Sequence, residues 1–173
     1  MQAFHVLAGP PGAGKSTVLD VLKAKVTCIP EVARRVLAVQ RATGGRGTGD
    51  QDPALFVALM AAQTEADHAH SDGVTVFDRA APDLLAFCAH YGLPDCSVRA
   101  LVSRCRYAPT VFWFAPWQDI YECDDERTLD FEGAKAFGTL LRKAYLASGY
   151  TLLDVPRVPP ESRAAFIFEA IVR

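Results

Sequence analysis

The first candidate for chemistry is a glycine-rich segment near the N-terminus, "LAGPPGAGKSTVLDVL" at residues 7–22. Within it, Gly9, Gly14, Lys15 and Ser16 fit the spacing G-x-x-x-x-G-K-[ST]. From average amino-acid usage, a chance match in a chain of this length is about one in a hundred or rarer. The preceding "AFHVL" is typical of a buried strand, and the residues that follow have helical spacing. This strand–loop–helix context predicts a phosphate-binding loop (P-loop).

The residue types in this loop suit the triphosphate of a nucleotide. Glycines leave the backbone free to turn several N–H groups toward one point, and the helix that follows adds its unpaired amides. The Lys15 ammonium would reach the outer phosphates, and the Ser16 hydroxyl would be a ligand of Mg²⁺. Without a bound phosphate, we expect Lys15 to face solvent. The residues predicted to bind ATP or GTP are Gly9, Gly12, Ala13, Gly14, Lys15, Ser16 and Thr17.

Three further charged segments follow apolar runs: "PEVAR" at residues 30–34, "DR" at 78–79 and "DDER" at 124–127. Any one of them could be a solvated surface or a helix cap, and Asp83, beside a proline, is predicted to be an acid of a first helical turn. The carboxyl ends of parallel strands, however, meet at one edge of a sheet. Together with the P-loop, the three segments therefore predict a phosphoryl-transfer cleft.

Length and composition are typical of one globular domain over residues 1–173, with 50% hydrophobic and 22% charged residues. A net charge of −2 and a pI of about 6.1 argue against a nucleic-acid partner. The five cysteines include no C-x-x-C pair, which argues against a disulfide framework or a metal site and favours a reducing compartment. With no apolar run near about 18 residues and no room for a signal peptide, we expect a cytoplasmic protein without a membrane span.

The elements that must position these residues alternate along the chain. Strands are predicted at residues 3–7, 25–29, 73–79, 110–116 and 150–156. Helices are predicted at residues 16–25, 30–44, 53–70, 82–91, 96–105, 131–148 and 160–172. The glycine-rich segment 43–53 is predicted to be a mobile loop. This alternation predicts an α/β fold, a five-stranded parallel sheet with helices on both faces.

Several short motifs along the chain resemble those of a known family. They are the P-loop strand, the "PE-x-AR" turn, the "FDR" strand end, "Y…D…ER", and the closing "GY…DVP". This set resembles the small ATPase- and kinase-like P-loop proteins, a group similar to the ribosylnicotinamide kinase domain of bifunctional NAD-biosynthesis proteins. More distantly, it resembles nucleoside and nucleoside monophosphate kinases. The resemblance covers roughly residues 4–156. It implies the P-loop NTPase fold with strand order 2-3-1-4-5, and a lid at about residues 117–130 after the fourth strand.

The resemblance also implies roles for residues outside the P-loop. Glu31 would face the phosphoryl acceptor and take the proton of its hydroxyl, and Arg34 would hold the acceptor or its phosphate. Asp78 would bind Mg²⁺ directly or through water, and Arg79 could bridge the acceptor and the phosphate. Arg127, in the lid, would neutralise charge on the transferred phosphoryl group. The residues expected to be catalytic are Lys15, Glu31, Asp78 and Arg127.

The identity of the acceptor and the type of activity stay open at this stage. The lid has one arginine amid four acidic residues, whereas typical monophosphate kinases use several arginines, and this favours a less charged acceptor or none. The leading hypothesis is an ATP-dependent kinase that acts on a small-molecule hydroxyl. The alternatives are a plain nucleoside triphosphatase and a regulatory protein whose nucleotide state moves the 43–53 loop to dock a lipid or protein partner. Turnover that requires an added acceptor would distinguish the kinase from both.

Overall fold

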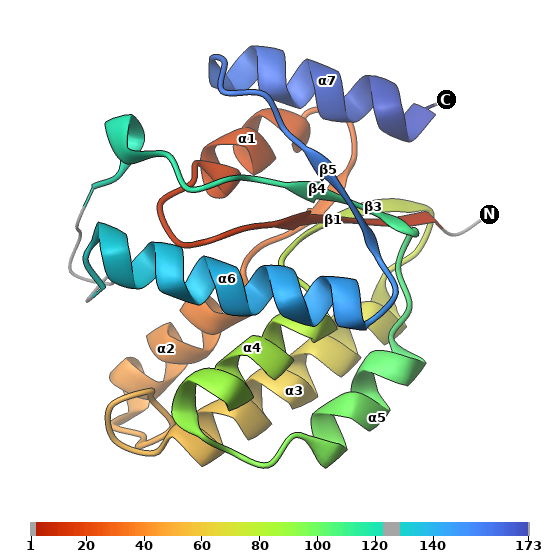
Figure 1. The fold of residues 1–173 in the computed structure, drawn as a ribbon. Coiled ribbons are helices and arrows are strands. Elements are labelled where there is room, and N and C mark those ends of the chain that lie inside the picture. Colours follow the sequence, from red (N-terminus) through yellow and green to blue (C-terminus); the bar gives the residue numbers. More distant parts are fainter. Residues whose placement is uncertain (1–2, 123–128, 173) are drawn as a thin grey trace.

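The computed structural model describes residues 3–122 and 129–172 and has the predicted α/β architecture (Figure 1). The five predicted strands form one sheet whose neighbouring strands all pair in parallel. The strands are β1 (Ala3–Ala8), β2 (Thr27–Ile29), β3 (Val74–Asp78), β4 (Thr110–Trp113) and β5 (Thr151–Asp154). Their order in the sheet is β2-β3-β1-β4-β5, which confirms the predicted order.

Helices cover both faces of this sheet (Figure 1). On one face, α1 (Lys15–Leu22) and α7 (Pro160–Val172) pack against each other. The other face is covered by α2 (Val32–Thr43), α3 (Pro53–His70), α4 (Ala81–Tyr91), α5 (Cys96–Arg104) and α6 (Phe131–Ala147). A short 3₁₀ turn, η1 (Gln118–Ile120), follows β4. The carboxyl ends of β1, β2 and β3 thus lead directly into the loops that carry the predicted site residues.

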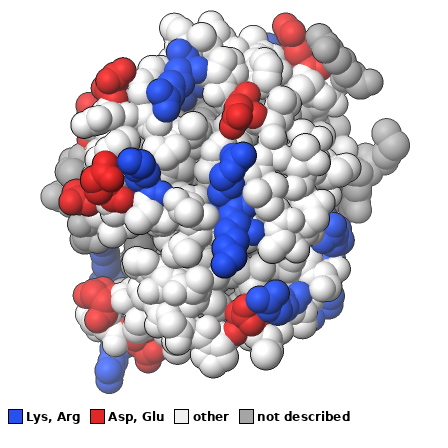
Figure 2. All heavy atoms as spheres, in the orientation of Figure 1, with Lys and Arg blue, Asp and Glu red and all other residues white. Residues whose placement is uncertain are grey.

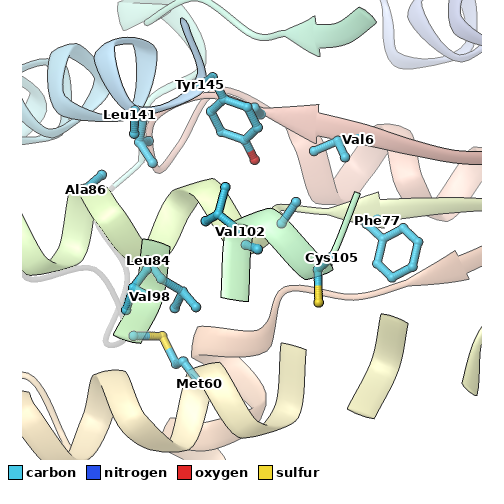
Figure 3. Packing of buried hydrophobic residues seen from close by; sticks show 14 of the residues in the cluster. Val6, Met60, Phe77, Leu84, Ala86, Val98, Val102, Cys105, Leu141 and Tyr145 are labelled. Carbon is cyan, nitrogen blue, oxygen red and sulfur yellow. The ribbon is translucent and has the colours of Figure 1, made fainter. Parts of the chain in front are cut away.

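The hydrophobic core has two parts, one on each face of the sheet. Val6 and Ala8 of β1 belong to the larger cluster, and Leu7 between them belongs to the smaller one under α1 and α7. Successive strand residues point to opposite faces, so a strand that is buried on both faces needs a continuous apolar run. Figure 3 shows the larger cluster, where side chains from the helices of that face meet the sheet.

Each strand has at least one end that differs from the prediction by one to three residues, and the later start of β2 has a local reason. The strand predicted from residue 25 begins at Thr27. The backbone N–H groups of Lys25 and Val26 instead donate to the carbonyl oxygen of Leu22, at 2.8 and 3.1 Å. These hydrogen bonds close the turn that follows α1, so the two residues are not available for pairing with β3.

The glycine-rich loop predicted to be mobile is tied to its neighbours by hydrogen bonds. The Gly47 N–H donates to the side-chain oxygen of Gln40 at 2.9 Å, and the Asp52 N–H donates to the Thr48 carbonyl at 3.0 Å. Asp52 also caps α3 by accepting from the Leu55 N–H at 3.0 Å. The mobility of the 43–53 loop stays a prediction, as do the lid and the single-domain organisation.

The surface carries mixed charges, and Figure 2 shows acidic and basic side chains next to one another in several places on one face. This distribution agrees with the net charge of −2. Within residues 3–122 and 129–172, no helix is long and apolar enough to cross a membrane.

Candidate active site

The loop between β1 and α1 has the backbone shape that phosphate binding requires. Gly9, Gly12 and Gly14 have φ angles of 145°, 76° and 82°, values that residues with a side chain rarely adopt. A Cβ atom on Gly9 would lie only 2.3 Å from the carbonyl oxygen of Phe114. Gly14 is the N-cap of α1, so the unpaired amides and the positive dipole end of that helix face the loop. The backbone therefore forms an anion-binding nest at the carboxyl end of β1.

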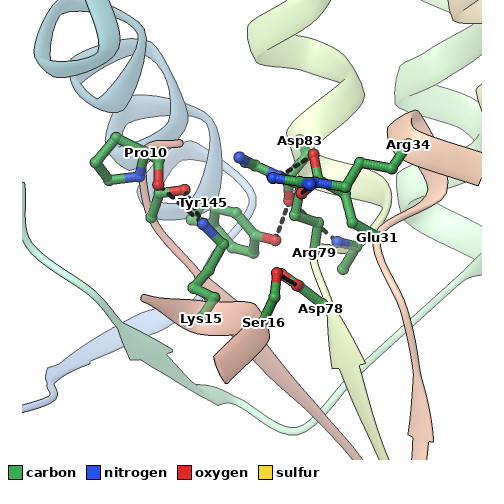
Figure 4. A network of polar contacts seen from close by, with 11 residues as sticks. Pro10, Lys15, Ser16, Glu31, Arg34, Asp78, Arg79, Asp83 and Tyr145 are labelled. Atoms are coloured by element: carbon green, nitrogen blue, oxygen red, sulfur yellow. Dashed lines mark hydrogen bonds and ion pairs between the residues drawn. The ribbon is translucent and has the colours of Figure 1, made fainter. Parts of the chain in front are cut away.

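The Lys15 side chain is buried, and the expectation that it faces solvent was wrong. It is 4% exposed, and its Nζ donates to the carbonyl oxygens of Gly9 at 3.0 Å and Pro10 at 2.9 Å (Figure 4). An ammonium group has three donors and no acceptor, and two carbonyl oxygens of the loop take two of these donors. Burial, and then the charge of Arg79, lower the pKa of Lys15 to about 8. A bound phosphate would have to replace these two hydrogen bonds.

We expect nucleotide affinity to fall as the pH rises above 8. The free Lys15 ammonium loses its proton near that pH, whereas a bound triphosphate favours the charged form, so affinity should drop by up to about tenfold per pH unit. Calorimetric titrations with ATP between about pH 7 and pH 9 would measure this effect. A Lys15→Met variant is the control, because its residual binding should not depend on pH in this range. Constant wild-type affinity across the range would contradict the prediction.

Ser16 and Asp78 come together as the predicted metal ligands. The Ser16 Oγ donates to Asp78 Oδ2 at 3.1 Å, from the start of α1 to the end of β3 (Figure 4). Adjacent ligands of an octahedral Mg²⁺, each about 2.1 Å from the ion, are about 3.0 Å apart, so this spacing fits. Asp78 Oδ1 is buried and has no hydrogen-bond partner in the part of the chain that the structure describes. A metal ion or its water shell would satisfy that oxygen.

The metal site would depend on the nucleotide. Among the described residues, no group of three or more His, Cys, Asp or Glu side chains could hold a metal ion. Mg²⁺ commonly binds through one or two protein oxygens plus water and substrate phosphates, which is the arrangement that Ser16 and Asp78 allow. Burial raises the pKa of Asp78 to about 6, so this carboxyl is ionised at neutral pH but loses its charge in mild acid.

Asp78→Asn is expected to weaken only the Mg²⁺-dependent part of nucleotide affinity. The amide keeps the shape of the carboxylate and loses its charge, so affinity without Mg²⁺ should change little. In the wild type, the Mg²⁺-dependent part should decline as the pH falls through about 6, where Asp78 takes up its proton. Titrations with and without Mg²⁺ would measure both effects. A variant that responds to Mg²⁺ as the wild type does would make Asp78 a structural acid.

Glu31 lies at the start of α2 and is held by two arginines. Its Oε1 is 3.0 Å from Arg79 Nε, and its Oε2 is 3.7 Å from Arg34 Nε. Burial raises the pKa of Glu31, but the positive charges of Arg79, Lys15 and Arg34 outweigh burial and hold the pKa below its usual value. Although Glu31 occupies the N-cap position of α2, its side chain makes no capping hydrogen bond. The carboxylate is therefore ionised and directed at the arginines, which argues against a merely capping role.

Arg79 occupies an unusual backbone conformation at the end of β3. Among the described residues, it is the one non-glycine residue with a positive φ, 72°. Its guanidinium lies between two carboxylates, with Glu31 at Nε and Asp83 accepting from Nη1 at 2.8 Å. Asp83 also accepts from the Ala80 N–H at 3.0 Å, which confirms its prediction as an acid of the first turn of α4. The sequence analysis did not predict that Asp83 also contacts Arg79, or that the Tyr145 hydroxyl donates to Asp83.

An open cleft lies between the P-loop and the start of α2. Its volume is about 1620 Å³, including solvent at its mouth. Residues 11–12 and 14–17 of the P-loop line one end, and Glu31 and Arg34 lie beside them. The farther walls carry ring side chains and two charged groups from α2, α3, α4 and the 44–52 loop, namely Arg41, Asp50, Phe56, Phe87, His90 and Tyr91. The cleft is thus deep enough to hold an organic molecule next to the P-loop.

The α4 residues of this cleft were missed by the sequence analysis. Phe87, His90 and Tyr91 are spaced i, i+3, i+4, so the sequence could have placed them on one face of a helix. Nothing in the pattern distinguishes a face that packs on the core from one that lines a cleft. Phe87 in fact does both, since its ring also packs against Phe137 at 4.9 Å between centroids.

The predicted lid is described only in part. Arg127, with the rest of residues 123–128, lies outside the described residues, so its role stays a prediction. The flanking Tyr121 lies against the P-loop, because a Cβ atom on Gly12 would be 2.4 Å from its ring. The Tyr121 hydroxyl donates to the Leu129 carbonyl across the undescribed segment.

Arg163 of α7 supports the P-loop from its outer side and was not predicted. Its guanidinium lies over the rings of Phe114 and Trp117, at 5.9 and 5.5 Å. Its Nη1 is 3.4 Å from the Ala13 carbonyl oxygen, and its side chain fills the space beside Gly14. This contact joins residues 150 positions apart, which no local pattern could reveal.

Comparison with known proteins identifies the family. A family model described as an AAA domain matches residues 4–163. The chain belongs to this AAA domain family. A search of curated proteins finds no significant match.

Solved structures with the same fold include two kinases. The structure of NadR protein in complex with NR has a TM-score of 0.74 at 15% identity; the match covers 99% of this AAA domain chain and 52% of the NadR chain. The chain therefore spans about half the length of that relative. Thymidylate kinase from Ehrlichia chaffeensis (TM-score 0.62, 12% identity) matches over 99% of both chains. Shikimate kinase from Acinetobacter baumannii in complex with shikimate (TM-score 0.62, 11% identity) matches over 99% of this chain and 93% of the shikimate kinase chain. These likenesses confirm the predicted P-loop kinase fold.

Proposed function

We propose that this AAA domain protein is a kinase that transfers the γ-phosphoryl group of ATP to a hydroxyl group of a small molecule. One observation carries the proposal: the P-loop and Glu31 open onto the same cleft, whose other walls carry ring side chains. A nucleotide sensor needs a phosphate site, but it does not need an ionised carboxylate beside that site in a cleft of this size. The names of the solved neighbours, which include thymidylate kinase and shikimate kinase, support the same class of reaction.

The residues divide the reaction between them. Lys15 would leave the Gly9 and Pro10 carbonyls and bind the outer phosphates, while the amides of the P-loop hold the rest of the triphosphate. The acceptor oxygen attacks the γ-phosphorus, the bond from that phosphorus to the β-phosphate oxygen breaks, and ADP leaves. Glu31 accepts the proton of the hydroxyl. Arg34 lines the cleft beside Glu31 and would orient the acceptor, and the buried Arg79 would hold the Glu31 carboxylate in place. Mg²⁺, held by Ser16 and Asp78, would screen the phosphate charge.

The test is whether ADP release requires an added acceptor. Wild-type protein would be incubated with ATP or GTP, Mg²⁺ and, in turn, nucleosides, ribosylnicotinamide, shikimate, sugars and amino alcohols. We expect one class of hydroxyl compound to raise ADP release well above the rate with water alone, and mass spectrometry to find the phosphorylated product. If none of them stimulates release and the protein still binds nucleotide, the kinase proposal fails and a nucleotide-dependent binding protein replaces it.

A further inference from the structure

A buried chain of polar contacts links α6 to the wall of the cleft (Figure 4). The Tyr145 hydroxyl donates to Asp83 Oδ2, and Asp83 Oδ1 accepts from Arg79 Nη1 at 2.8 Å. Arg79 Nε lies 3.0 Å from Glu31 Oε1, and Glu31 lines the cleft. The four residues belong to α6, α4, the turn after β3 and the start of α2. Each contact thus joins a different pair of elements.

Tyr145 and Asp83 lie outside the wall of the open cleft. Both are fully buried, and neither belongs to the lining of the open cleft. Asp83 instead borders a second, smaller cavity of about 400 Å³, together with Arg79 and Tyr107. The polar contacts that join Tyr145 to the open cleft run through Asp83 and Arg79 to Glu31.

Arg79 needs support to stay where it is. Its left-handed backbone conformation is rare for a residue with a side chain. Two carboxylates compete for the charge of its guanidinium: Glu31, on the side of the cleft, and Asp83, on the side away from it. The position of Asp83 decides how far the guanidinium reaches toward the cleft.

Three donors fix Asp83. They are the Tyr145 hydroxyl and the Ala80 N–H on Oδ2, and Arg79 on Oδ1. A carboxylate with only backbone and arginine partners could rotate about its χ2 angle, which is a soft torsion. Burial, and then the negative charge of Asp83, raise the pKa of Tyr145 well above its usual value, so the phenol remains a donor. Its hydroxyl therefore locks the orientation of Asp83.

We propose that Tyr145 is a positioning residue: through Asp83 it holds Arg79 against Glu31 and so sets the efficiency of phosphoryl transfer, with no part in nucleotide binding. This inference rests on the proposed kinase function, because it assigns Glu31, the partner of Arg79, to the acceptor. The link from Tyr145 to Arg79 can nevertheless be tested without turnover.

The test compares Tyr145→Phe with Tyr150→Phe. Both tyrosines are buried, and their rings pack edge to face at 5.9 Å between centroids, but the Tyr150 hydroxyl takes no part in the network. With the best acceptor, Tyr145→Phe should lower kcat by about tenfold, the lower end of what support residues around a site usually cost, and leave the KM for ATP unchanged. Tyr150→Phe should leave both values near those of the wild type.

A spectroscopic measurement reports on Arg79 directly. In ¹H–¹⁵N spectra, the Nε–H signal of Arg79, assigned with Arg79→Lys, should shift and exchange faster with water in Tyr145→Phe but not in Tyr150→Phe. Asp83→Asn is a second variant that should alter the same signal, and thermal melting would verify that each variant is folded.

The outcomes separate this inference from the proposed function. An unchanged Arg79 signal in folded Tyr145→Phe overturns the inference, and so does wild-type kcat in an active enzyme. If no acceptor stimulates the wild type, the kinase proposal has failed and the part of the inference that concerns catalysis falls with it. The Arg79 signal then decides whether Tyr145 positions that residue: a changed signal supports the link, and an unchanged one removes it.

Discussion

Replacing Lys15 with alanine is expected to lower ATP affinity at neutral pH by about 100-fold or more and to abolish turnover. Truncating one partner of a buried, hydrogen-bonded charge pair costs about 2–5 kcal/mol, and in the bound state Lys15 would be such a partner of the outer phosphates. The backbone amides of the P-loop would remain, so residual weak binding is compatible with the prediction. Calorimetry with ATP and Mg²⁺ would measure the change.

The fold should survive this substitution. The Lys15 ammonium makes two hydrogen bonds to loop carbonyls, but its lowered pKa shows that burial of the charge opposes them. As the pH rises from about 8 toward the usual lysine value, the empty protein should become more stable, because the unfolded chain then binds that proton more tightly. Lys15→Ala should lack this dependence in thermal melts.

A second lysine near α1 provides the matched control. Lys23 follows the last residue of α1 and forms an exposed ion pair with Asp20 at 2.6 Å. Lys23→Ala should bind ATP as the wild type does, because exposed ion pairs contribute little and this one is far from the P-loop. Equal ATP affinity in wild type and Lys15→Ala would remove the P-loop from the proposed function.

The sequence predicted the fold and part of the site because both depend on local patterns. Apolar runs that alternate with segments of helical spacing predicted the α/β class. The resemblance to small P-loop proteins supplied the strand order, which the structure confirms. The P-loop, Glu31 and Asp78 were predicted to lie together because each is at or near the carboxyl end of a strand. In a parallel sheet, strand ends meet at one edge, so position in the chain is enough to bring such residues together.

Other parts of the site depend on contacts that no local pattern encodes. Tyr145 meets Asp83 across 62 positions, and Arg163 meets Ala13 across 150. In the sequence, Tyr145 is one ring in an amphipathic helix and Arg163 one charge near a helix start. Lys15 shows a different limit: its place in the P-loop motif gave no sign that two loop carbonyls would hold its ammonium group in a buried position.

The second large effect is expected at Glu31. Glu31→Gln should keep ATP binding and lower acceptor phosphorylation by about 100-fold or more, as the loss of a general base usually does. Phosphoryl transfer through a loose transition state needs little base strength, so positioning of the acceptor hydroxyl should account for much of the loss. The amide cannot accept the proton, and it no longer balances the charges of Arg79 and Arg34.

The structure makes this substitution a clean test of chemistry. Glu31 makes no capping hydrogen bond, and Arg79 keeps its second carboxylate partner, Asp83, so the variant should fold. Asp52→Asn is the control: Asp52 does cap its helix, and the substitution should leave phosphorylation unchanged. The assay is acceptor-stimulated ADP release, with ATP affinity measured in parallel. If Glu31→Gln phosphorylates the acceptor at the wild-type rate, Glu31 only balances the charge of Arg79, and the acceptor proton must leave by another route.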